Sequence, residues 1–145
     1  MTEAHEQRFT HSYVVAYPAH EPRKKDPNYV DFEAYRRRTK ATARCAYAVE
    51  IGDDSECDHE HPLELHHSHI EFALQNGVDL KRLERVYPGV SDREHVGAWV
   101  ESAANLTWYC RWHHRGQGGV HSASSSDFEA SHFVTRMIEH PGELG

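Results

Sequence analysis

The sequence lacks the features that mark membrane and secreted proteins. It has no run of about 18 apolar residues, the length that a membrane-spanning helix requires. Its first eight residues, Met-Thr-Glu-Ala-His-Glu-Gln-Arg, are polar where a secretory signal needs an apolar stretch. We therefore expect a soluble, cytoplasmic protein with no membrane partner.

The chain is also poor in cysteine. Its three thiols, Cys45, Cys57 and Cys110, cannot all pair within one chain. With no export signal, we expect a reducing compartment in which disulfides do not persist. Metal ligation and plain burial remain as the two roles open to these thiols.

A surplus of basic residues is missing too. The chain has 16 Lys and Arg against 23 Asp and Glu, a net charge of −7. This argues against a nonspecific nucleic-acid binder, because phosphate neutralisation supplies most of the affinity of such proteins. However, residues 50–64 hold seven of the acids and no base. The acidity is a local block, and the rest of the chain carries equal numbers of acids and bases.

The length of 145 residues and the 38% hydrophobic content fit one compact domain. We expect an extended arm over residues 1–28, in which 13–17 is a candidate edge strand, and a single domain over 29–145. Local patterns predict an α+β fold with strands over 45–51, 63–67 and 105–110. Predicted helices cover 29–44, 70–77 and 92–102, and a Ser-x-x-Glu capping box at 126–129 predicts a last helix through about 139.

Histidine is the compositional outlier, with 14 residues. Adjacent pairs stand at His66-His67 and His113-His114, on two separate segments. Imidazoles on two segments suit a borderline divalent metal ion, and such an ion can polarise a phosphate. A histidine that does not bind the ion can take a proton from water. Neighbours on a strand point to opposite faces, so one site can use both members of a pair only where the strand breaks, for instance at Ser68. The alternative is histidines with no shared partner.

Three motifs together resemble the HNH endonuclease family: Leu65-His66-His67, Asn105-Leu106 and Cys110-x-x-His113-His114. From Leu63 to Ile138 the chain is similar to small HNH proteins of bacteriophages of actinobacteria. The resemblance implies a small, zinc-stabilised ββα-metal core over 45–67 and 105–139, with a helical insertion over 70–103 and flanking helices. For a phage protein, the compartment would be the cytoplasm of the bacterial host.

The same resemblance implies roles for individual residues. His67 would be the general base that activates water, and His66 and His114 would hold a catalytic Mg, Mn, Ni or Zn ion. Asn105 would brace the loop that holds the base. The family's last ligand would fall on Gly118, so His121, beyond a glycine-rich stretch, either replaces it or is an ordinary loop histidine.

Many relatives also carry a structural zinc between two Cys-x-x-Cys knuckles, but here Ala48 and His113 stand at two of the cysteine positions. A Cys3His zinc site remains open, with three buried thiols as the alternative; its members would be Cys45, Cys57, Cys110 and His113. Arg111 and Arg115 flank the second histidine pair, where a guanidinium can hold a substrate phosphate.

The resemblance thus implies a DNA endonuclease or nicking enzyme that leaves a 5′-phosphate and a 3′-hydroxyl. The acidic block favours an alternative, a catalytically silent zinc-stabilised module that binds a host or phage packaging protein. A nuclease acting on RNA is a third interpretation, because nothing in the residues selects DNA over RNA. The bases at 36–44 either follow a phosphate backbone or form a solvated helix face.

Overall fold

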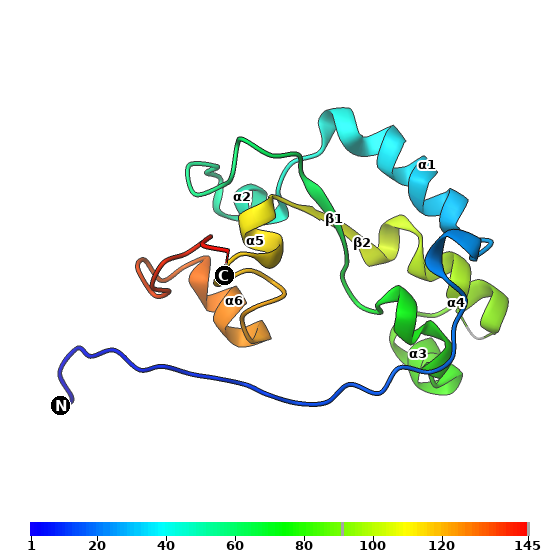
Figure 1. Ribbon diagram of the computed structural model, residues 1–145, viewed down its shortest axis with the longest axis horizontal. Coiled ribbons are helices and arrows are strands. Elements are labelled where there is room, and N and C mark those ends of the chain that lie inside the picture. The colour runs from blue at the N-terminus through cyan, green and yellow to red at the C-terminus, as the bar shows by residue number, and fades with distance from the viewer. Residues whose placement is uncertain (91, 145) are drawn as a thin grey trace.

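The computed structural model describes residues 1–90 and 92–144 and arranges short helices around a two-stranded sheet (Figure 1). Strands β1 (Glu64–His67) and β2 (Leu106–Tyr109) pair antiparallel, with Glu64 opposite Tyr109 and His67 opposite Leu106. The fold is α+β, as predicted. Position 91, in the predicted helical insertion, and position 145, the predicted end of the domain, lie outside the described residues.

The other regular elements of the described chain are ten helices, four of which are short 3-10 helices. In chain order they are η1 (Arg23–Lys25), α1 (Tyr29–Thr39), η2 (Lys40–Thr42), α2 (Ala46–Ile51), η3 (Phe72–Gly77), α3 (Leu80–Val86), α4 (Arg93–Val100), η4 (Ala103–Asn105), α5 (Arg111–Arg115) and α6 (Ser125–Ser131).

Two core clusters lie at opposite ends of the strand pair. Figure 1 shows α2, α5 and α6 gathered at one end and α3 and α4 at the other. The first cluster contains the three cysteines with Tyr47 and Ala48, and the second is aliphatic, built on Val96 and Val100. The strand pair therefore connects a sulfur-rich half to an apolar half.

The predicted strand over 45–51 is wrong, because these residues form helix α2. Tyr47 and Ala48 are both buried, and burial of two adjacent side chains suits one face of a helix packed on a core better than a half-exposed strand. Gly52 has φ of 69°, the left-handed conformation that ends a helix.

The last helix also differs from its prediction. Its N-cap is Ser124, whose Oγ accepts a hydrogen bond from the Asp127 amide at 3.1 Å, so α6 begins at Ser125 and not after Ser126. It ends at Ser131 instead of continuing to about 139. Arg136 and His140 have φ of 57° and 54°, values that a continuing right-handed helix excludes.

The arm is shorter than expected and forms no strand in the described chain. Residues 1–22 have no regular structure and run as an extended segment along the molecule (Figure 1). Within the predicted edge strand, Tyr13 and Val14 are 81% and 97% exposed. The end of the arm packs against the domain, because the His20 ring lies 5.6 Å from the Phe72 ring and the Arg23 guanidinium lies 4.0 Å over the Phe32 ring of α1.

The other predicted elements agree with the structure within a few residues. These are the helix over 29–44, which becomes α1 and η2, the strands over 63–67 and 105–110, and the helical segments between the strands. A search of residues 1–90 and 92–144 finds no helix with the length and hydropathy of a membrane span.

Candidate metal centres

Three cysteines and one histidine converge beside the start of α5. The Sγ atoms of Cys45, Cys57 and Cys110 lie 3.6, 3.7 and 3.1 Å from Nδ1 of His113. All four donor atoms lie within 4.8 Å of one another. A tetrahedral zinc with ordinary Zn–S and Zn–N bonds separates sulfur from nitrogen by roughly 3.5 Å. The buried Cys3His cluster is therefore compatible with a structural zinc ion.

Local geometry explains why two of these ligands meet. Cys110 is the N-cap of α5, and its Sγ accepts a hydrogen bond from the His113 amide, so the Cys-x-x-His spacing places both side chains on the first turn. Cys45 likewise precedes α2, and thiolates are favoured at helix N-termini. A hydrogen bond from Cys110 lowers the pKa of Cys45 to about 7, whereas burial raises the pKa of Cys57 to about 12. A bound dication would hold all three as thiolates.

Three histidines form a second group at the edge of the sheet. His66 comes from β1, His114 from α5 and His121 from the glycine-rich loop, and their donor nitrogens lie within 4.8 Å of one another. Nε2 of His114 and Nε2 of His121 are 3.1 Å apart, close to the roughly 3.3 Å between two imidazole nitrogens on one tetrahedral zinc. Nδ1 of His66 is buried and has no hydrogen-bond partner. An ion among the three imidazoles would be held by one nitrogen of each ring.

The protonation states of this group suit metal binding. Burial, with His121 and His114 nearby, lowers the pKa of His66 to about 4. Burial also lowers the pKa of His114, although the hydrogen bond to Glu64 acts in the opposite direction. Neutral imidazoles carry the lone pairs that a metal needs.

Glu64, which the sequence interpretation missed, orients one of these ligands. Its Oε1 accepts a hydrogen bond from Nδ1 of His114 at 2.8 Å, which leaves the Nε2 lone pair of His114 for an ion. Arg115 donates to both carboxylate oxygens at 3.0 Å. Burial opposes ionisation, but the hydrogen bonds from Arg115 and His114 keep the pKa of Glu64 below its ordinary value. Its position two residues before His66, on the same strand face, is the signal that would have found it.

His67 does not join this group. Strand β1 keeps its regular alternation up to His67, so the His67 side chain points to the opposite face of the sheet from His66. Its ring stacks on Phe32 at 5.6 Å, and its Nε2 lies 2.5 Å from Oε1 of Glu101. Glu101, 1% exposed, also accepts from Arg23 at 3.1 Å. Arg23 and Glu101 were not predicted, since only the folded chain brings them to β1.

Asn105 fastens the loop that follows His67. Its Oδ1 accepts from the amides of His69 and Ile70 at 2.8 and 3.0 Å, and its Nδ2 donates to the carbonyls of Ile70 and Val100, each at 2.9 Å. These are the contacts expected of a residue that braces the loop after β1.

We expect Asn105→Ala to reduce the free energy of unfolding by about 3 kcal/mol, because it leaves the part-buried amides of His69 and Ile70 without their acceptor and empties a fully buried side-chain position. Urea denaturation would measure the change. Asn76→Ala is the matched control, since that exposed side chain makes one bond, to the Ala19 carbonyl. Equal losses in the two variants would contradict the bracing role.

The two candidate phosphate-binding arginines are engaged within the protein. Arg111 Nη1 lies 2.9 Å from Nε2 of His61, and Arg115 pairs with Glu64. Trp108 is a core residue that donates to Thr39 Oγ1 at 3.0 Å, so it does not present its ring to a ligand. Of the two arginines, Arg115 lies beside the imidazole group.

Comparison with family models, curated proteins and solved structures found no match for this chain. The two metal centres are therefore interpreted from their own geometry.

Proposed function

We propose that the chain is a metal-dependent endonuclease of the HNH type that hydrolyses DNA phosphodiester bonds. The observation that carries the proposal is the convergence of His66, His114 and His121, whose donor nitrogens lie within 4.8 Å of one another. Three protein ligands leave a coordination position open, as hydrolytic sites require. His121 is exposed, so the open side faces solvent and a substrate can reach it.

The arrangement of elements supports an HNH-type ββα core. Strand β2, which pairs antiparallel with β1, is followed directly by α5; β1 contributes His66, and α5 contributes His113 and His114. Mg, Mn, Ni or Zn held by the imidazoles would polarise the scissile phosphate and stabilise the leaving oxygen. An all-imidazole donor set favours zinc or nickel over magnesium. The buried Cys3His cluster would hold a separate, structural zinc.

His67 is the base in this proposal. Nε2 of His67 donates to Glu101, which fixes the tautomer and leaves the lone pair on Nδ1 for a proton from water. The negative charge of Glu101 stabilises the resulting imidazolium. In this proposal the scissile phosphate lies across the end of β1, with the metal ion near His66 on one face and the base His67 on the other.

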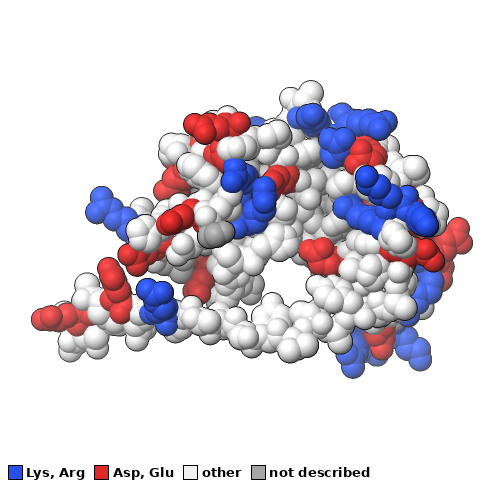
Figure 2. Space-filling view, viewed as in Figure 1, with Lys and Arg blue, Asp and Glu red and all other residues white. Residues whose placement is uncertain are grey.

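A basic surface on α1 would approach the DNA backbone. Arg37, Arg38 and Lys40 are exposed near the end of the helix, whereas Arg36 pairs with Glu33 at 3.0 Å. Figure 2 shows Lys and Arg side chains gathered where α1 lies in Figure 1. This local surplus offsets the acidic block, because phosphate contacts depend on local charge.

A second candidate function is a zinc-stabilised binding module that grips a host or phage packaging protein without turnover. The specific observation in its favour is that His67 and the imidazole group lie on opposite faces of β1.

A supercoiled-plasmid assay separates the two. We expect the purified chain to nick or cut the plasmid with at least one of Mg, Mn, Ni or Zn, leaving 5′-phosphate ends, and His67→Ala to lower the rate by about 10²- to 10⁴-fold. No cleavage with any ion, or equal cleavage by His67→Ala, would contradict the nuclease. A structured RNA tested in parallel decides between DNA and RNA.

Glu101→Gln should lower kcat by about 100-fold or more, because an amide can present its N–H to Nε2 and so select the wrong tautomer of His67. Single-turnover cleavage of a labelled duplex would measure this. Glu94→Gln is the matched control on the exposed side of α4. The effect should fall on kcat and leave zinc content unchanged; a loss of zinc would instead mean that Glu101 supports the fold.

A further inference from the structure

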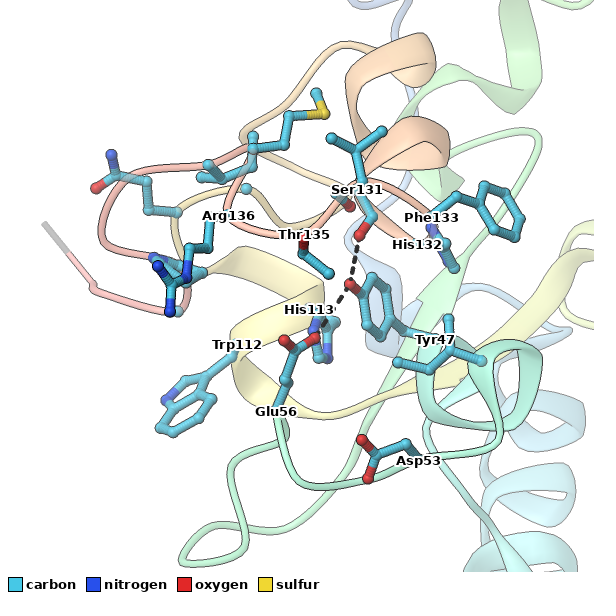
Figure 3. Close-up of a pocket in the computed structure, with 18 residues that line it drawn as sticks. Tyr47, Asp53, Glu56, Trp112, His113, Ser131, His132, Phe133, Thr135 and Arg136 are labelled. Carbon is cyan, nitrogen blue, oxygen red and sulfur yellow. Dashed lines mark hydrogen bonds between the residues drawn. The ribbon is translucent and has the colours of Figure 1, made fainter. Parts of the chain in front are cut away.

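A third group of metal-binding side chains joins α6 to α2. Glu50 lies near the end of α2, and Glu129 and His132 lie near the end of α6, with one donor atom of each within 4.8 Å of the others. The ring of Tyr47 separates this group from the Cys3His cluster, with centroids 3.7 Å from His113 and 4.2 Å from His132. Figure 3 shows these three rings side by side. The group is thus distinct from both centres above.

The hydrogen bonds of His132 determine which of its nitrogens faces the carboxylates. Nδ1 lies 2.8 Å from the Phe128 carbonyl, and because a carbonyl oxygen only accepts, Nδ1 must carry the hydrogen. In the neutral ring Nε2 then has a bare lone pair, and it lies 3.2 Å from Oε2 of Glu50. Two acceptors face each other at this distance only with a cation between them, which is either a proton or a metal ion.

Burial and charge both favour a cation at this position. The His132 side chain is only 3% exposed, so its ring is fixed with Nε2 toward the two acids, while Glu50 is 47% exposed and can adjust. Among the ion pairs of residues 1–90 and 92–144, Glu50 pairs with His132 and with no Lys or Arg, and Glu129 pairs with no basic residue. A divalent ion would balance two carboxylates, whereas a single proton on His132 balances one.

We propose that Glu50, Glu129 and His132 form a third metal site, which takes a borderline divalent ion such as Zn²⁺. One imidazole nitrogen with two carboxylate oxygens suits such an ion better than Ca²⁺ or Mg²⁺, which prefer oxygen ligands throughout. Three protein ligands leave room for water, so this ion exchanges more readily than a thiolate-bound zinc. The proposal does not depend on nuclease activity.

The ion would clamp α6 onto α2. These helices are also joined by the Tyr47 hydroxyl, which donates to the Ser131 carbonyl at 2.9 Å (Figure 3), and by Phe128, which packs against the cysteine cluster. His121 lies four residues before α6 begins, so the clamp fixes the C-terminal end of the loop that carries His121. Free zinc would in this way stabilise the segment that completes the imidazole group.

Zinc stoichiometry tests the site. The full chain is dialysed against buffered free zinc, and bound zinc per chain is measured by plasma mass spectrometry. We expect Glu50→Gln/Glu129→Gln to bind one zinc fewer than the native chain at saturation, and each single variant to bind it at least about tenfold more weakly. Glu71→Gln/Glu94→Gln, with the same change in charge, should match the native chain.

Equal zinc counts in the native chain and in the Glu50→Gln/Glu129→Gln variant would overturn the proposal. Cobalt substitution checks the fold, because thiolate-to-cobalt absorption reports the Cys3His cluster independently. If the double variant lost that absorption, His132→Phe would take its place, since phenylalanine keeps the packing on Tyr47 and removes Nε2. An unchanged zinc count in folded His132→Phe would equally overturn the site.

Discussion

Cys110→Ala is expected to leave the protein largely unfolded at room temperature. Cys110 is 1% exposed and its Sγ is the sulfur nearest to His113, so the substitution removes a central ligand of the Cys3His cluster. Structural zinc binding is worth about 10–16 kcal/mol in small metal-dependent folds, as much as the whole stability of an ordinary domain. The half of the chain that contains α2, α5 and α6 has few other buried apolar side chains.

Circular dichroism during urea denaturation, together with zinc content, would measure this effect. Val100→Ala is the matched control, because Val100 is equally buried but lies in the aliphatic cluster, and its truncation should cost only about 2 kcal/mol. Removal of zinc by a strong chelator should reproduce the effect of Cys110→Ala in the native chain. A Cys110→Ala protein that unfolds cooperatively within about 2 kcal/mol of the native chain would contradict a structural zinc.

His66→Ala is expected to abolish cleavage while sparing the fold. The variant loses one of three ligands. Loss of a residue that only hydrogen-bonds to a metal ligand typically lowers metal affinity or activity by about 10- to 100-fold, so loss of a ligand should lower the cleavage rate by more than about 100-fold. The free energy of unfolding should change little, because Nδ1 of His66 has no hydrogen-bond partner that the substitution would leave unpaired. One exchangeable ion should be lost and the thiolate-bound zinc retained.

Plasmid cleavage and metal content, measured on the same preparation, would check both halves of this prediction. His95→Ala is a suitable control, since His95 is an exposed histidine whose contacts are to Asp92 in its own helix cap. Loss of the thiolate-bound zinc in His66→Ala would mean that the two centres are one folding unit. Retention of full activity would remove His66 from the catalytic site.

Part of the two candidate metal-binding groups could be predicted from short sequence patterns, because local spacing constrains which side chains lie together. Cys110-x-x-His113 fits one helical turn, and the histidine pair at 113–114 directs neighbouring side chains of α5 to different centres. The alternation that predicted β1 equally predicts that Glu64 and His66 share a face. These relations involve few residues and little tertiary structure.

Other features depended on contacts that no local pattern contains. Glu101 meets His67 across 34 residues, and Arg23 reaches the same carboxylate across 78 residues, from a segment expected to be part of an extended arm. The segment over 45–51 is a short, mostly apolar run before a turn, which predicts a strand, yet it packs Tyr47 and Ala48 against the cysteines as a helix. In each case tertiary packing outweighs local preference.

The strand geometry also changes the interpretation of the first histidine pair. A break at Ser68 would have allowed His66 and His67 to share one site from the same side, but β1 remains regular through His67. In the proposed nuclease, His67 and the metal-binding histidines would act on a phosphate from the two faces of a strand end.

The central claim, that the Cys3His group and the three-histidine group each bind a metal ion, is tested most directly by anomalous diffraction at the zinc absorption edge. One peak is expected among Cys45, Cys57, Cys110 and His113, and a second among His66, His114 and His121. Density from a single thiolate-bound ion, with none between the imidazoles in crystals grown with excess zinc, would contradict the account.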